Sequence, residues 1–437
     1  AEDGIRDVER SRGLGDVYKR QGIHPVSTGL GQVRPPPSPV GTPLRVGGGE
    51  LVSAYVVKTL LEAGHEVSVA TTSGFEKEKY AEWFNLDLGK IRTYTLLPKL
   101  LPMFAIYQRL GFYVPLGRAI KKEKPDKVFV DNELYKPVIK LKKELGFKLL
   151  EYIHFPFHAV KFLKFEPSKK EELYKKYFMD VEGYHRKYEK GFWKIYFEVF
   201  LKLYDRVARD NPFEVADVVM ANSRYIAKLI RLLWGNDPIV IHPPVRTDDF
   251  KPLCGRSFED RDDSVVMIGR ITPEKRIDEV IKAISLSQTK PVLRVVGGLI
   301  PANMPYKAKL EKMAEEMEVK LEFYPNVHRK ELVDLATSSK VFVHAAIGEH
   351  FGIAVVEGMA AGCPVIVHRS GGSYEDITDC GNYGLSFDSV EELAEHIDKL
   401  LTEPKLWKIY HEKSLNRAMF FSEQGFAEKL LKIVESG

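Results

Sequence analysis

A chain of 437 residues, 44% of them hydrophobic, is long enough to bury the cores of two ordinary domains. Its 65 Lys and Arg are mixed with 61 Asp and Glu and leave a net charge of only +4, so charge does not indicate nucleic-acid binding. Three widely spaced cysteines indicate neither a disulfide framework nor a zinc site, and no uncharged apolar run reaches the ~20 residues that span a bilayer. We therefore expect a cytoplasmic protein that is soluble or peripheral to a membrane and has no nucleic-acid partner.

Residues 1–41 are rich in proline, glycine and serine and show no apolar periodicity. Such a composition does not offset the entropy lost on ordering, so we expect a poorly ordered tail. The stretch at 13–21 also looks like a translated cloning adapter, which indicates a non-native segment that resequencing of the locus would reveal.

Regular patterns begin after three glycines at 47–49. The segment 50–63, closed by Gly64, predicts a helix, and the alternating residues 65–70 predict a strand. Further apolar runs predict strands at the ranges 127–130, 148–153 and 218–221, with helical stretches between them. This alternation favours a parallel sheet in an N-terminal domain of residues 42–240.

Four prolines between 238 and 252 mark the junction with a second domain, residues 241–437. A strand is predicted at 264–268, and apolar residues at helical spacing predict a helix over 277–284. Further strands are predicted at the ranges 292–296, 321–324, 341–344 and 364–368. The C-terminal half is therefore a second doubly wound α/β domain.

The strongest motif is a pair of glutamates, Glu349 and Glu357, with seven residues between them. A helix that begins after Gly352 offers unpaired N–H groups and the positive end of its dipole, which suit a diphosphate. The carboxylates on either side can accept hydrogen bonds from sugar hydroxyls. A glutamate pair on a helix more often marks a solvated face, but Glu357 stands among apolar residues, where an idle carboxylate is costly.

A second motif places Arg270 and Lys275 in the loop between the strand at 264–268 and the helix at 277–284. Ligands of open α/β sheets bind at this carboxyl edge of the strands. Two cations there would neutralise the charge that builds on a departing diphosphate, which makes a catalytic metal unnecessary. Without Arg270, an exposed helix start would explain Lys275 equally well.

Taken together, the glycine turn, the Arg and Lys pair and the two glutamates resemble the GT-B glycosyltransferases of family 4, over about residues 47–425. The resemblance implies two Rossmann-like doubly wound domains that face a central cleft, with the last helix packed back on the N-terminal domain. It implies a retaining glycosyltransferase that takes a hexose from a nucleotide-sugar donor and needs neither cofactor nor metal.

The same resemblance assigns roles to residues. The catalytic group would be His154 with Arg270, Lys275 and Glu349. Within it, Arg270 and Lys275 would hold the donor diphosphate, Glu349 would bind the transferred sugar, and His154 would lie near the reacting sugar. Backbone positions and the second glutamate, which would bind the ribose, complete the implied donor site: Gly48, Gly49, Phe351, Gly352, Ile353 and Glu357.

Three segments, 152–156, 349–353 and 370–372, are similar to the mannosyltransferases that extend dolichol-linked oligosaccharide on the cytosolic face of a membrane. This similarity implies GDP-mannose as donor and a glycan or polyprenyl-linked acceptor. The first strand of such an N-terminal domain, expected before Gly47, is not recognisable, so we expect a sheet that lacks it.

Two other functions stay open. A sugar-nucleotide epimerase of the same fold would need paired acid and base carboxylates around the sugar and no acceptor. A nucleotide-sugar binder without turnover would keep the same donor contacts. The residues argue against a dehydrogenase, because the predicted strand is followed by Thr71 and not by the acidic residue that holds an NAD ribose.

Residues 155–207 mix aromatic residues with lysines. Near their end, Lys194, Glu198, Lys202 and Asp205 form one polar stripe on an otherwise apolar helix, which favours a helix buried in the domain. The alternative is an interfacial surface whose rings enter lipid headgroups while its lysines meet anionic lipid.

Overall fold

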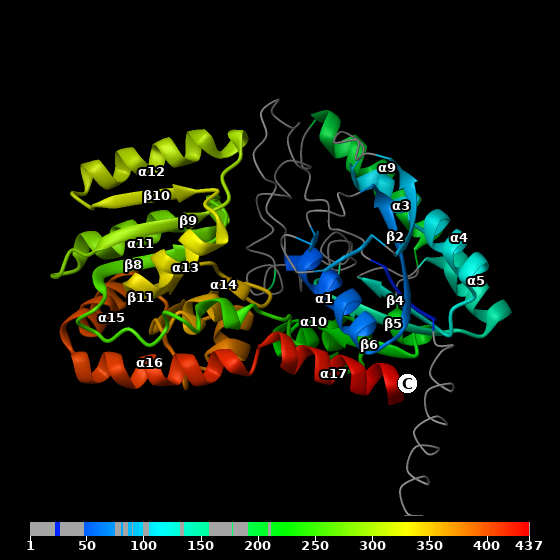
Figure 1. Ribbon diagram of the computed structural model, residues 1–437. Coiled ribbons are helices and arrows are strands. Elements are labelled where there is room, and N and C mark those ends of the chain that lie inside the picture. The colour runs from blue at the N-terminus through cyan, green and yellow to red at the C-terminus, as the bar shows by residue number, and fades with distance from the viewer. Residues whose placement is uncertain are drawn as a thin grey trace, which may run out of the picture.

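The structure is a computed structural model that describes residues 22–26, 48–74, 80–81, 86–89, 91–98, 105–131, 135–156, 177, 191–208 and 211–436. These residues form two α/β domains that lie side by side (Figure 1). Each domain is built on one sheet in which all paired strands are parallel.

The N-terminal domain has a seven-stranded sheet in the order β3-β2-β1-β4-β5-β6-β7. Its strands are β1 (Gly22–Val26), β2 (Glu66–Ser73), β3 (Arg92–Leu97), β4 (Lys127–Asp131), β5 (Lys148–Ile153), β6 (Val218–Ala221) and β7 (Ile239–Val240). Its described helices are α1 (Gly48–Glu62), α3 (Ala105–Leu110), α4 (Tyr113–Glu123), α5 (Lys136–Leu145), α9 (Gly191–Val207) and α10 (Arg224–Trp234).

Strand β1 corrects one prediction from the sequence. It pairs in parallel with β2 through Ile23 and Val67 and with β4 through His24 and Val128, so the sheet does have its first strand. The strand comes from the range 1–41, where composition predicts a poorly ordered tail. A five-residue strand between two neighbours draws its hydrogen bonds from them, so local composition is a poor guide to it. The rest of 1–41 lies outside the described residues.

Alternate residues of the central strands supply two separate cores, as the period of two requires. Val128 and Val130 of β4 face a cluster with α4 and α5. Phe129, between them, faces the other side of the sheet, where α1 lies. The sheet is therefore covered on both faces, which is the doubly wound arrangement that the sequence predicts.

The C-terminal domain repeats this plan with a six-stranded sheet in the order β10-β9-β8-β11-β12-β13. Its strands are β8 (Asp262–Ile268), β9 (Val292–Gly297), β10 (Leu321–Pro325), β11 (Ser339–His344), β12 (Val365–His368) and β13 (Leu385–Phe387). Its helices are α11 (Ile277–Leu286), α12 (Met304–Glu316), α13 (Arg329–Ser338), α14 (Ile353–Ala360), α15 (Val390–Thr402) and α16 (Pro404–Met419). Val265 and Met267 of β8 face the core of α11, α12 and α15, whereas Val266 and Ile268 face the core of α13 and α14.

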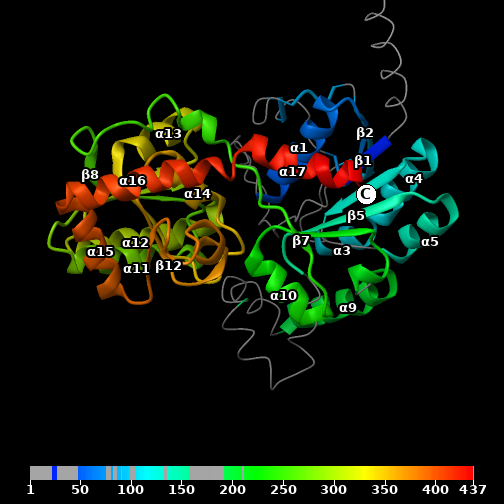
Figure 2. The same cartoon turned by 90° about the horizontal axis from the view of Figure 1, so that it is seen from below.

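The last helix, α17 (Glu423–Ser436), leaves the C-terminal domain and packs on the N-terminal one. Its buried residues Phe426, Leu430 and Val434 share a core with Val52 and Val56 of α1. Figure 2 shows α17 running beside α1. The chain thus crosses between the domains twice, and each crossing restricts their relative movement.

A buried carboxylate joins the two domains directly. Asp376, in the C-terminal domain, accepts hydrogen bonds from the backbone N–H groups of Arg224 (2.6 Å) and Tyr225 (3.1 Å) at the start of α10. His242 Nε2 lies 2.8 Å from the same side chain. A carboxylate at a helix N-terminus satisfies unpaired amides and is favoured by the helix dipole. Asp376 therefore fixes α10 of one domain against the other.

We expect Leu430→Ala in α17 to lower the free energy of unfolding of the N-terminal domain by about 2–5 kcal/mol, because it leaves a cavity against α1. Urea denaturation followed by circular dichroism measures the change. Lys432→Ala, at an exposed position of the same helix, is the control and should change the value by less than about 0.5 kcal/mol. Equal effects from both variants would show that α17 does not stabilise this domain.

Candidate active site

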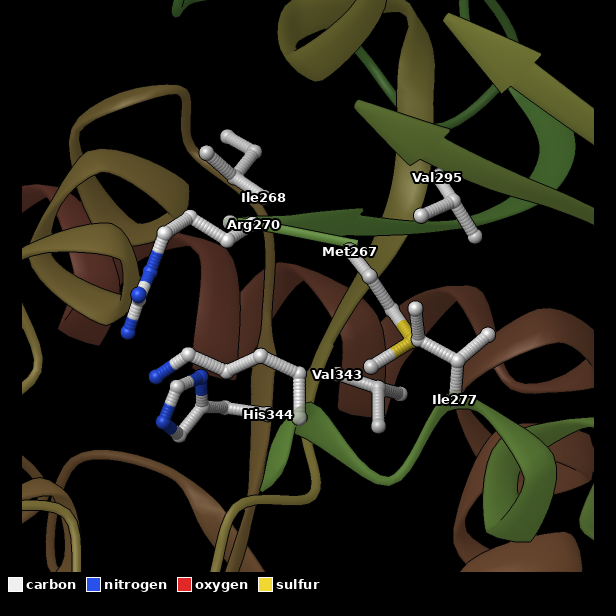
Figure 3. Close-up of a pocket in the computed structure, with 9 residues that line it drawn as sticks. Met267, Ile268, Arg270, Ile277, Val295, Val343 and His344 are labelled. Carbon is white, nitrogen blue, oxygen red and sulfur yellow. The ribbon is translucent and has the colours of Figure 1, made fainter. Parts of the chain in front are cut away.

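The carboxyl ends of β8, β9 and β11 surround a pocket in the C-terminal domain. Gly297 is required here, because an added Cβ would lie 1.4 Å from the carbonyl oxygen of Gly269. In Figure 3 Met267, Ile277, Val295 and Val343 gather at one end of the pocket, and Arg270 and His344 lie at the other. The pocket is lined by Met267, Ile268, Gly269, Arg270, Lys275, Ile277, Val295, Val343 and His344.

Lys275 and Glu349, which are far apart in sequence, meet at the polar end of this pocket. The Nζ atom of Lys275 lies 2.5 Å from Oε2 of Glu349, and Nε2 of His344 lies 3.2 Å from the same oxygen. Burial alone would raise the pKa of the Glu349 carboxyl, but the Lys275 charge and the His344 hydrogen bond hold that pKa well below its usual value. Glu349 is therefore ionised at neutral pH and fixed in place by two donors.

Arg270 follows β8 and keeps about half of its side chain exposed, with Nη2 3.3 Å from Glu274. It lines the pocket together with Lys275, so the structure brings the predicted Arg and Lys pair to one place. Arg270 and Lys275 thus place two cations at the carboxyl edge of the sheet, where ligands of such domains bind.

Helix α14 begins beside these residues. Gly352 precedes it with φ +108°, a backbone conformation that residues with a Cβ rarely adopt. Phe351 is buried against His242 and Phe421, with ring centroids 5.5 Å away in each case, so its side chain belongs to the core. The groups that Phe351, Gly352 and Ile353 can offer a ligand are therefore their backbone amides.

Glu357 lies one turn along α14 and is bound by a residue that the sequence reasoning missed. Nη1 of Arg329 donates to Oε1 of Glu357, while its Nε donates to Asp249 at 2.8 Å. Arg329 also lies over the ring of Phe250, 5.0 Å from its centroid. Arg329 starts α13, the helix after β10, at the carboxyl edge of the sheet where ligands of such domains bind. This position in the sequence could have identified Arg329 as a candidate site residue.

The N-terminal domain contributes His154 at the end of β5. Its Nε2 lies 3.2 Å from Oδ1 of Asp131, the buried last residue of β4. A Cβ added at Gly49 would lie 3.8 Å from the same Nε2, so the start of α1, Gly48 and Gly49, is beside this histidine. Asp131 was also missed, although it ends β4, the strand that pairs with the one His154 follows.

A contact between the domains brings the site residues of the C-terminal domain close to those of the N-terminal domain. The ring of His350, next to Glu349, stacks on Phe155, next to His154, with centroids 4.4 Å apart and planes 12° apart. The hydroxyl of Ser223 donates to the carbonyl oxygen of His350 at 2.6 Å. The predicted residues of both domains therefore face a common region at the domain interface.

Within the described residues, no group of three or more His, Cys, Asp or Glu side chains has the arrangement of a metal site. The same part of the chain contains no helix with the length and apolarity needed to cross a bilayer. The metal-independent reaction that the sequence predicts stays a prediction.

Two family models match this chain. The model described as Glycosyltransferase Family 4 matches residues 46–249, and that described as Glycosyl transferases group 1 matches residues 256–417. Among solved structures, a sucrose-phosphate synthase from Thermosynechococcus elongatus superimposes with a TM-score of 0.65 at 18% identity, covering 95% of this chain and 99% of that one. The superposition shows that this chain and the synthase share a fold.

Relatives with assigned names align along both domains. A GDP-Man:Man(3)GlcNAc(2)-PP-Dol alpha-1,2-mannosyltransferase of Dictyostelium discoideum is 25% identical over 424 residues, which cover 89% of this chain and 82% of that protein. The Homo sapiens protein of the same name is 27% identical over 365 residues, 79% of this chain and 72% of that protein. With family models matching both halves and these relatives spanning both domains, the chain belongs to family 4 of the GT-B glycosyltransferases and is an enzyme that transfers a sugar.

Proposed function

We propose that this glycosyltransferase moves mannose from GDP-mannose to a lipid-linked oligosaccharide in an α-1,2 linkage, with retention of configuration. The observation that carries the proposal is the alignment over 82% and 72% of two relatives named for this reaction. The pocket supports it, because its polar end combines cations for a diphosphate with a carboxylate for sugar hydroxyls.

In the proposed reaction, an acceptor hydroxyl forms a bond to the anomeric carbon while the bond from that carbon to the diphosphate breaks. The diphosphate leaves with the bonding electrons, so negative charge grows on its oxygen, and this oxygen takes the proton that the acceptor hydroxyl loses. Arg270 and Lys275 stabilise this charge, as do the amides at the start of α14. A metal ion is not part of the proposed mechanism.

The sugar is held on both sides in this proposal. Glu349 is ionised and fixed by Lys275 and His344, so it accepts hydrogen bonds from hydroxyls of the transferred sugar. His154 approaches from the N-terminal domain, with its ring oriented by Asp131. Glu357, oriented by Arg329, binds the ribose hydroxyls of the donor.

We expect Lys275→Ala to lower kcat by about 100-fold or more, since it removes a cation that acts on the leaving diphosphate. The assay follows transfer from GDP-mannose to a Man(3)GlcNAc(2) diphosphate carried on a short isoprenoid. Lys282→Ala, which changes a partly exposed lysine of α11 paired with Asp278 and Glu279, should retain wild-type turnover. Unchanged turnover in Lys275→Ala would overturn the assignment of the diphosphate site.

Arg329→Met should weaken GDP binding by about 10-fold, because it removes charge-assisted hydrogen bonds that orient Glu357. Calorimetry with GDP measures the dissociation constant. Arg294→Met is the matched control, because Arg294 pairs with Asp262 and Glu322 on the same sheet without contacting Glu357. If both variants bind GDP as the wild type does, binding of the ribose does not depend on the orientation that Arg329 gives to Glu357.

Helix α9 supports a membrane contact near the acceptor. The sequence favoured a helix buried in the domain, and one face is buried, with Phe197, Phe200, Leu201 and Tyr204. The other face exposes Phe192 (69%), Ile195 (63%) and Val199 (45%) at the spacing of a single helical stripe.

The residues before α9, 157–176 and 178–190, lie outside the described residues. We propose that this stripe, with Lys194 and Lys202 exposed beside it, meets the cytosolic face of the membrane that carries the acceptor.

The double variant Phe192→Ser, Ile195→Ser should therefore float less with vesicles of phosphatidylcholine and phosphatidylglycerol than the wild type does, because the ring of Phe192 and the aliphatic side chain of Ile195 no longer enter the headgroup region. Ile409→Ser, which changes an exposed apolar residue on α16 (51%), is the control and should leave flotation unchanged. A wild-type chain that does not float with these vesicles would refute the proposed contact.

A further inference from the structure

His350 occupies a position between the two domains that neither the motif nor the proposed mechanism uses. Its ring stacks on Phe155 of the opposite domain at 4.4 Å, and its carbonyl oxygen is held by Ser223 of that domain at 2.6 Å. The side chain is thus fixed from outside its own domain. Its electrostatic neighbours are Glu349, Lys275 and His154, which are the residues that surround the proposed reaction.

The ring nitrogen Nε2 of His350 is buried and has no hydrogen-bond partner among the residues that the structure describes. A buried polar atom without a partner costs free energy, and most such atoms in folded proteins are satisfied. Polar side chains near His350 are already paired with one another: Glu349 with Lys275 and His344, and His154 with Asp131. A bound substrate is therefore the natural source of the partner.

The state of the ring limits the kind of partner. Burial lowers the pKa of His350 to about 4, with the nearby charges of Lys275 and His154 acting in the same direction and Glu349 opposing them. The imidazole is therefore neutral at pH 7. A neutral imidazole nitrogen can accept from a hydroxyl or donate to its oxygen, according to the tautomer. It attracts a phosphate much less than Arg270 and Lys275 do.

We propose that His350 is a substrate-contacting residue whose Nε2 forms a hydrogen bond with a sugar hydroxyl at the domain interface. The proposal rests on the proposed function for the identity of the sugars. The hydroxyl belongs either to the transferred sugar of the donor or to the acceptor sugar, and these two sources share the chemistry that the ring recognises. In either case the contact forms only when the two domains hold His350 and Phe155 together.

Three variants separate hydrogen bonding from stacking. His350→Phe keeps an aromatic ring against Phe155 but removes the nitrogen, and His350→Gln restores a polar group that can bond a hydroxyl. Phe155→Leu keeps the imidazole and removes the stack. Thermal unfolding without ligand shows whether each variant is folded before its kinetics are compared.

The experiment measures dissociation constants for GDP and GDP-mannose, and then the KM for Man(3)GlcNAc(2) diphosphate on a short isoprenoid. In His350→Phe, GDP binding should be unchanged. A contact with the donor sugar predicts that GDP-mannose binding weakens by about 3- to 10-fold, whereas a contact with the acceptor predicts the same rise in the acceptor KM. His350→Gln should recover most of either loss.

Two results would overturn the proposal. In one, His350→Phe matches the wild type for GDP, GDP-mannose and the acceptor, so no hydroxyl depends on the nitrogen. In the other, His350→Gln is as impaired as His350→Phe and Phe155→Leu reproduces the loss, so only packing matters. A wild-type chain that binds GDP-mannose without transferring mannose would contradict the proposed function instead, and the ratio of GDP to GDP-mannose affinity would still test His350.

Discussion

Asp376 joins the two domains of this enzyme, and the rest of the site depends on that connection. Its buried carboxylate accepts the first amides of α10, so a negative charge of the C-terminal domain lies at the helix N-terminus of the other domain. The ring of His242 is the third group that contacts the Asp376 carboxylate. Because α10 begins one residue after Ser223, the same arrangement places the Ser223 hydroxyl on the carbonyl of His350. The loop that carries Glu349 is thereby aligned with the N-terminal domain.

The charged residues of the site form pairs that prepare them for a donor. Lys275 and His344 keep Glu349 ionised in a buried position, where an unpaired carboxylate would be costly. Arg329 donates hydrogen bonds to both Glu357 and Asp249 and so fixes the position of Glu357. Arg270 remains half-exposed at the mouth of the pocket. The protein thus provides cations for a diphosphate and oriented carboxylates for hydroxyls before any ligand is bound, and such preorganised charges are the main source of electrostatic stabilisation in group transfer.

Much of the fold could be predicted because hydrophobic periodicity is strong in the buried strands. The predicted strand at 148–153 has the bounds of β5, and the predicted helix at 50–63 differs from α1 by only one or two residues at each end. Gly64 closes that helix with φ +84°, as its position indicates.

Strand β1 was missed because it is short and lies among proline-rich residues. The sequence favoured a buried α9 and left an exposed interfacial surface open as the alternative; the helix has one buried face and one exposed apolar stripe, because periodicity does not tell which neighbours a face meets.

The sequence by itself determined two doubly wound domains, the family, and the motif residues Arg270, Lys275, Glu349 and Glu357, because local patterns encode helices, strands and strand-end loops. Only the tertiary structure decided which side chains pair. Arg329 and Glu357 lie on α13 and α14, which follow different strands, and Asp131 and His154 lie at the ends of the neighbouring strands β4 and β5. His344 ends β11, and Glu349 returns to it from the loop that follows this strand. The stack of His350 on Phe155 joins residues of two domains. Such contacts depend on strand order and domain docking, which residue spacing in one chain does not specify.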